Sequence, residues 1–178
     1  MATNNRSVGK DNSASTRRGF LRGAAIAGLS LSAVPAIARA DDDSDGLQGA
    51  GQDRLDERTV LDFWDAWNTK CEDKIMSFFT KDAEYHNIPV DPVIGIDAIS
   101  ALVASFLAAF TSVNIVTLSI AAHNGVVHTE RTDNFKVVNG RVVALPVAGT
   151  LYLTRGKIRL WRDYFDLATF EAQSGLKL

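Results

Sequence analysis

Three tight-turn signals divide residues 124–165, NGVVHTERTDNFKVVNGRVVALPVAGTLYLTRGKIRLWRDYF, into strand-like segments. They are Asn124-Gly125, Asn139-Gly140 and Arg155-Gly156, and an Asn-Gly pair between apolar runs is a strong short-range hairpin signal. Between these turns apolar residues recur with a period of two, as in strands that bury one face. We therefore predict an antiparallel meander of four strands, over residues 113–122, 126–138, 141–153 and 157–165.

The chain before the meander has a helical pattern. One amphipathic helix is predicted from about Arg54, a short second helix around 75–79, and a third that begins with Asp97 as its N-cap. A short strand at 83–88 separates the second and third helices, and one or two helical turns are predicted at 167–172. Helices followed by a meander indicate an α+β fold, in which N-terminal helices pack on one face of a curved sheet.

Length and composition favour one folded domain. The chain has 178 residues, 46% of them hydrophobic, and its single cysteine excludes an internal disulfide framework. We assign the domain to residues 54–178 and predict a flexible linker at 41–53, which is acidic and rich in glycine.

Residues 1–40 resemble a twin-arginine export signal. Arg17 and Arg18 precede Phe20 and Leu21, a weakly apolar run follows, and Ala38-Arg39-Ala40 has small residues at cleavage-type spacing. We therefore expect export to the periplasm or the extracellular space. Cleavage after Ala40 would leave a formal charge of about −7, which argues against nucleic acid and anionic membranes as partners.

Two charges interrupt the apolar face of the strand at 126–138. Its odd positions begin with Val127 and end with Phe135, so this face should point into the core. Arg131 and Asp133 nevertheless lie in the middle of that face. Because charges are costly to bury, we interpret the two residues as part of a polar site rather than as packing.

A third charge, Asp163, shares one face of the last strand with Trp161 and Phe165. A carboxylate between apolar rings either finds partners or has a raised pKa. The short strand at 83–88 adds Tyr85 and Asn87, which point to one face and can hold a water molecule.

These residues predict a pocket in which Arg131 lies between Asp133 and Asp163. The guanidinium can fix both carboxylates while they hold one proton, so that one acts as a base and the other as an acid. The same residues could instead form a buried ion pair that serves only fold specificity, and strand parity leaves that alternative open. The predicted substrate-binding wall is apolar and comprises Phe106, Phe135, Leu145, Val147, Trp161, Phe165 and Phe170.

Other chemistries lack their motifs. There is no G-x-S-x-G nucleophile elbow. Cys71 has no histidine relay and is interpreted as a small core residue, and His86, His123 and His128 lack metal-ligand spacing, so no metal is predicted.

Three segments resemble the limonene-1,2-epoxide hydrolase family. They are Tyr85-His86-Asn87 with its proline-containing loop, Thr129-Glu130-Arg131-Thr132-Asp133, and the run from Trp161 to Glu171. The resemblance extends over about residues 53–178 and implies a cystatin-like, NTF2-type cone with a mixed sheet that the first short strand joins. It also implies a homodimer and a one-step reaction without cofactor.

The resemblance implies a role for each polar residue. Asp163 would take a proton from water, Tyr85 and Asn87 would orient that water, Asp133 would protonate the epoxide oxygen, and Arg131 would bridge the aspartates. The expected reaction converts a hydrophobic epoxide, of terpene type or otherwise alicyclic, to a vicinal diol. Two alternatives are an exported binding protein for an apolar ligand and a ketosteroid-isomerase-like proton-transfer enzyme.

Replacement of Arg17 and Arg18 by lysine is expected to retain the precursor in the cytoplasm, because the export receptor reads the arginine pair. Immunoblots of cell fractions, in a bacterium with this pathway, measure the effect. Arg6→Lys, outside the motif, is the matched control. Unchanged export of the double variant would contradict the assignment.

Overall fold

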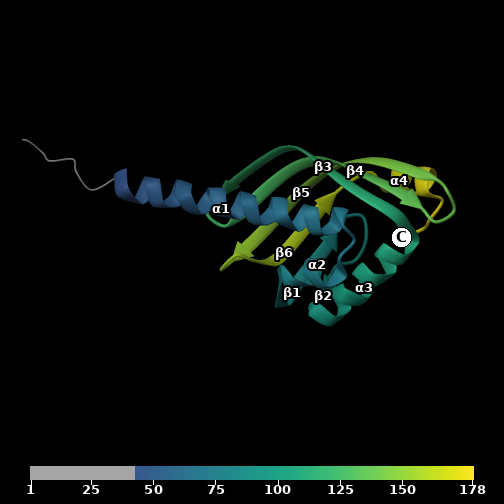
Figure 1. Ribbon diagram of the computed structural model, residues 1–178, viewed down its shortest axis with the longest axis horizontal. Coiled ribbons are helices and arrows are strands. Elements are labelled where there is room, and N and C mark those ends of the chain that lie inside the picture. Colours follow the sequence, from purple (N-terminus) through teal and green to yellow (C-terminus); the bar gives the residue numbers. More distant parts are fainter. Residues whose placement is uncertain (1–42) are drawn as a thin grey trace, which may run out of the picture. The chain divides into compact units, whose positions relative to one another are not determined.

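The computed structural model describes residues 43–178, so the predicted export signal lies outside the described residues. This part of the chain forms four helices and six strands (Figure 1). The helices are α1 (Asp43–Asn68), α2 (Glu72–Ser77), α3 (Ile96–Ala109) and α4 (Leu167–Ser174). The strands are β1 (Phe79–Asn87), β2 (Val93–Ile94), β3 (Phe110–His123), β4 (Val126–Val137), β5 (Val142–Thr154) and β6 (Lys157–Tyr164).

All six strands form one sheet in the order β2-β1-β6-β5-β4-β3. The predicted meander is confirmed, because β3 to β6 pair antiparallel in sequence order. β1 joins the far side of the meander by parallel pairing with β6, which makes the sheet mixed as the family resemblance implied. The helices pack on this curved sheet, so the predicted α+β class is confirmed (Figure 1).

The helix α1 begins earlier than the sequence indicated. We expected a linker up to residue 53, but the structure is helical from Asp43. Bonds within the helix support its early turns, since Arg54 Nε donates to the carbonyl of Ala50 at 3.2 Å. Asp53 also accepts a hydrogen bond from the backbone N–H of Asn124, at 3.0 Å. This contact with the β3–β4 turn anchors residues whose composition alone resembles a linker.

Three local details also differ from the prediction. The N-cap of α3 is Gly95, whose φ of 91° favours glycine, and Asp97 lies in the first helical turn, where its charge complements the helix dipole. Phe79 begins β1 instead of ending the second helix. Cys71 is exposed, at the N-cap of α2, and is not a core residue.

The aromatic face of α1 contacts the sheet at Trp161. The ring centres of Phe63, Trp64 and Trp67 lie 5.2, 5.5 and 5.9 Å from that of Trp161. These four side chains are at most 4% exposed, and aromatic pairs at such distances add to the stability gained by burying their area. Their packing places α1 directly beside the strand that carries Asp163.

In the described part of the chain, no helix has the length and apolar character that a membrane crossing requires.

Candidate active site

Strand register brings the candidate residues to one region of the sheet. Thr129 on β4 pairs with Gly149 on β5, which pairs with Asp163 on β6, which in turn pairs with Asn87 on β1. This row crosses four strands. Tyr85 belongs to the neighbouring row, where it pairs with Trp161. The parallel β1–β6 pairing therefore places Tyr85 and Asn87 next to Asp163.

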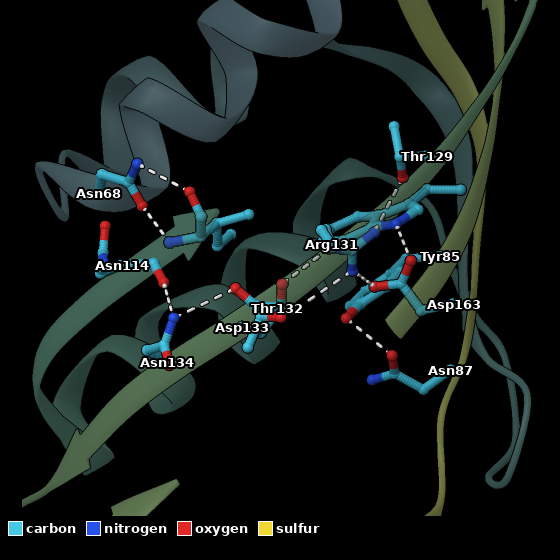
Figure 2. A network of polar contacts seen from close by, with 12 residues as sticks. Asn68, Tyr85, Asn87, Asn114, Thr129, Arg131, Thr132, Asp133, Asn134 and Asp163 are labelled. Atoms are coloured by element: carbon cyan, nitrogen blue, oxygen red, sulfur yellow. Dashed lines mark hydrogen bonds and ion pairs between the residues drawn. The ribbon is translucent and has the colours of Figure 1, made fainter. Parts of the chain in front are cut away.

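Arg131 joins both aspartates (Figure 2). Its Nε donates to Asp133 Oδ1 at 2.9 Å and its Nη2 to Asp133 Oδ2 at 3.2 Å, which is a bidentate pair. The same Nη2 also donates to Asp163 Oδ2, and Nη1 donates to Thr129 Oγ1 at 3.3 Å. The predicted arrangement of one guanidinium between two carboxylates is present in the structure.

Two tryptophans complete the surroundings of this charge cluster. Trp161 Nε1 donates to Asp163 Oδ1 at 2.7 Å, so both oxygens of this carboxylate have a protein donor. The guanidinium carbon of Arg131 lies 4.4 Å from the ring centre of Trp64, within range of a cation–π contact. Arg131, Asp163 and Asp133 are only 1%, 4% and 7% exposed, so these contacts replace most of the solvation that water would provide.

Burial acts in opposite directions on the pKa values of Asp133 and Arg131. It raises the pKa of Asp133 to about 6, against the lowering effect of Arg131 and with a further increase from the charge of Asp163. Burial lowers the pKa of Arg131, but Asp163 and Asp133 outweigh this effect and raise that pKa above its ordinary value. Near neutral pH the site therefore holds a permanent cation beside Asp133, of which a larger fraction is protonated than of an ordinary aspartate.

Tyr85 and Asn87 form a polar pair beside the aspartates. Tyr85 Oη donates to Asn87 Oδ1 at 2.9 Å, and the Tyr85 ring stacks on Trp161 with 4.0 Å between ring centres. Burial, followed by the charge of Asp163, raises the pKa of Tyr85 above its ordinary value. The phenol is therefore neutral and can act as a hydrogen-bond donor and acceptor.

A cavity lies against these groups. The space between atoms here is about 690 Å³, part of it open to solvent. Its polar lining consists of Tyr85, Asn87, Asp133 and Asp163. All seven residues of the predicted apolar wall also line it, together with five that the sequence did not indicate, namely Trp67, Leu102, Val103, Ile115 and Leu178.

Sequence reasoning missed the residues that support the charge cluster. Thr129 belongs to the same inward parity as Arg131 and Asp133, so alternation could have identified it. Trp161 was interpreted only as pocket wall, although its N–H bonds to Asp163. No local signal indicates that Trp64 lies against Arg131, because that contact depends on how α1 packs on the sheet. Within residues 43–178 no group of three or more His, Cys, Asp or Glu side chains has the geometry of a metal site.

Comparison with known families accounts for this arrangement. Residues 55–174 match the model of the limonene-1,2-epoxide hydrolase catalytic domain, which is more than half of the chain. The chain belongs to the limonene-1,2-epoxide hydrolase family. The matched span contains all five polar residues of the site and every predicted wall residue.

Solved structures agree with membership of the limonene-1,2-epoxide hydrolase family. An epoxide hydrolase of this type from M. tuberculosis is 25% identical, with a TM-score of 0.62 over 68% of this chain and 91% of that chain. A hypothetical protein from Catenulispora acidiphila with a ketosteroid isomerase-like fold is 23% identical, with a TM-score of 0.60 over 66% and 92%. A SnoaL-like polyketide cyclase from Shewanella denitrificans is 13% identical, with a TM-score of 0.61 over 67% and 96%. The last two show a shared fold alone.

Proposed function

We propose that this protein is an epoxide hydrolase that adds water directly to a hydrophobic epoxide and releases a vicinal diol. The observation that carries the proposal is the bridge from Asp163 through Arg131 to Asp133, at the polar end of an otherwise apolar cavity. A strained ring ether needs a proton on its oxygen as one C–O bond breaks, and a nucleophile at the carbon. Two carboxyl groups at one site, one that donates a proton and one that accepts a proton, meet both needs.

Asp163 is the proposed base and Asp133 the proposed acid. The bidentate bond from Arg131 orients Asp133, and the raised pKa of Asp133 keeps a protonated fraction available. Trp161 donates a hydrogen bond to one carboxylate oxygen of Asp163, and Arg131 donates one to the other. Each of these oxygens has a second lone pair that can accept a hydrogen bond from water. Arg131 stays cationic throughout and stabilises whichever carboxyl group is ionised.

Tyr85 and Asn87 are proposed to hold the attacking water next to Asp163. Asp163 removes one proton from this water as its oxygen forms a bond to an epoxide carbon. The C–O bond of the ring breaks at that carbon, and Asp133 transfers its proton to the departing oxygen. The diol then contains both oxygens, and a proton must pass from Asp163 to Asp133 before the next cycle. No covalent intermediate with the protein forms.

A panel of terpene, aryl and alicyclic epoxides tests the activity through detection of the diol product. Hydrophobic members are expected to be hydrolysed, and single turnover in ¹⁸O-labelled water should place the label in the diol. Label in an aspartate would contradict direct attack by water. Tight binding without turnover across the panel would instead favour a binding protein for apolar ligands.

Asp163→Asn and Asp133→Asn are each expected to lower kcat by about 10²–10⁴-fold, because each removes one proton-transfer group at almost constant size. Circular dichroism and Tm check that both variants remain folded. Asp62→Asn is the matched control, since the Asp62 side chain lies on α1, is 41% exposed and forms an ion pair with Arg58. A rate close to that of the wild type in either site variant would exclude the proposed roles.

The pH profile of kcat/KM provides a separate test of Asp133. Its pKa is raised from 3.8 to about 6, so the acid form persists to higher pH than in an ordinary aspartate and is lost as pH rises through that value. We expect kcat/KM to fall about tenfold per pH unit well above pH 6. A flat profile between pH 6 and 8 would show that no proton from this group is needed.

Export of the protein and its assembly into a homodimer are further predictions. The outer face of the sheet is compatible with a homodimer, because Val116 and Tyr164 are 41% and 47% exposed there and Pro146 and Ala148 are exposed between them. The mass of the purified protein in solution would test the dimer.

A further inference from the structure

Gly149 lies where the charge cluster leaves no room for a side chain. An ideal Cβ atom built on this residue would be 2.3 Å from Arg131 Nη1, 2.9 Å from Asp163 Oδ1 and 2.9 Å from Thr129 Oγ1. Real Cβ atoms essentially never approach other heavy atoms within 3.0 Å. Any other residue at this position would therefore force at least one group of the cluster to move.

The strand register explains this crowding. Arg131 on β4 pairs with Val147 on β5, whereas Asp163 on β6 pairs with Gly149. The guanidinium must therefore pass diagonally over β5 to reach a carboxylate two strands away. Gly149 is the inward-facing residue of β5 on that route, two positions beyond Val147. The missing side chain leaves the space that the guanidinium occupies.

The backbone gives no other reason for glycine here. Gly149 lies inside a strand, and its φ is outside the left-handed region that favours glycine, unlike that of Gly125 or Gly140. Glycine weakens a strand interior because it has no side chain to pack and loses more conformational entropy on folding. Its presence at this position is thus better explained by the close approach of Arg131 than by a turn or a bulge.

We propose that Gly149 is a positioning residue, which lets the guanidinium of Arg131 cross β5 and bridge Asp133 and Asp163. The proposal rests on the proposed hydrolase function for its kinetic consequence, but its structural consequence is independent of turnover. Gly149 does not touch substrate in this scheme. It acts through Arg131, on the relative placement of the two carboxyl groups.

Gly149→Ala is expected to lower kcat by about 100-fold, the scale of a misplacement of about 1 Å, and to change KM by less than about threefold. The matched control is Gly51→Ala, which adds the same methyl group on α1 with nothing within 4 Å except its own helix, and should keep the wild-type kcat. A kcat within about threefold of wild type for Gly149→Ala would overturn the proposal. A loss of the same size in Gly51→Ala would also count against it.

A double-mutant cycle in thermal stability separates this proposal from the hydrolase function. Gly149→Ala should lower Tm by more than about 5 °C when Arg131 is present. In an Arg131→Gln background, whose shorter side chain ends before Nη1, the same substitution should lower Tm by less than half as much, because only the contacts of 2.9 Å with Asp163 and Thr129 remain. Equal losses in both backgrounds would show that the added methyl group clashes with something other than the guanidinium, and would overturn the proposal even if the protein hydrolyses epoxides.

The cycle also covers a failure to fold. If Gly149→Ala alone does not fold, the double variant with Arg131→Gln is expected to recover a cooperative thermal transition. A double variant that stays unfolded, while Arg131→Gln alone folds, would overturn the proposal. If no epoxide is turned over by the wild type, the stability cycle still decides the role of Gly149, and the panel above decides the function.

Discussion

The structure depends on burying the guanidinium of Arg131, which is 1% exposed, among groups that replace its hydration. Removing a charge from water costs several kcal/mol even after relaxation, so an unpaired arginine here would be strongly destabilising. Asp133, Asp163 and Thr129 accept its hydrogen bonds, and the ring of Trp64 lies against its face. These partners come from β4, β6 and α1. All of these contacts to the guanidinium therefore form only when the strand register of the sheet and the packing of α1 are both correct.

The same burial produces the chemistry that we propose. In water both aspartates would be ionised at neutral pH, and neither could serve as an acid. Desolvation raises the pKa of Asp133 to about 6, while the guanidinium keeps a favourable partner beside each carboxyl group. The apolar wall of the cavity is part of this effect, because it limits access of water to the carboxyl groups. A purely structural ion pair would need neither a cavity nor the Tyr85–Asn87 pair beside it.

The parallel pairing of β1 with β6 is the second constraint. A four-strand meander alone would carry Arg131, Asp133 and Asp163 but not Tyr85 and Asn87, the residues that we propose to orient the water. By adding β1 beyond β6, the sheet places Asn87 opposite Asp163 and Tyr85 opposite Trp161. Residues separated by about half of the folded chain thus become neighbours. Gly149 also depends on which strands are neighbours. Arg131 crosses β5 at this residue, and the guanidinium has room there because glycine has no side chain.

Much of this arrangement was predictable from local pattern. Alternation along β4 to β6 and the Asn-Gly turns specify a meander, and parity shows that Arg131, Asp133 and Asp163 face inward, because successive side chains in a strand point to opposite faces. The bridge from Arg131 to both aspartates was also predicted, but tertiary structure alone decided the other contacts of these residues. The route of Arg131 over Gly149, its contact with Trp64 and the continuation of α1 back to Asp43 depend on contacts between elements distant in sequence. Hydrophobic periodicity and composition describe one segment of the chain at a time. They carry no information about which other segment will pack against it in the fold.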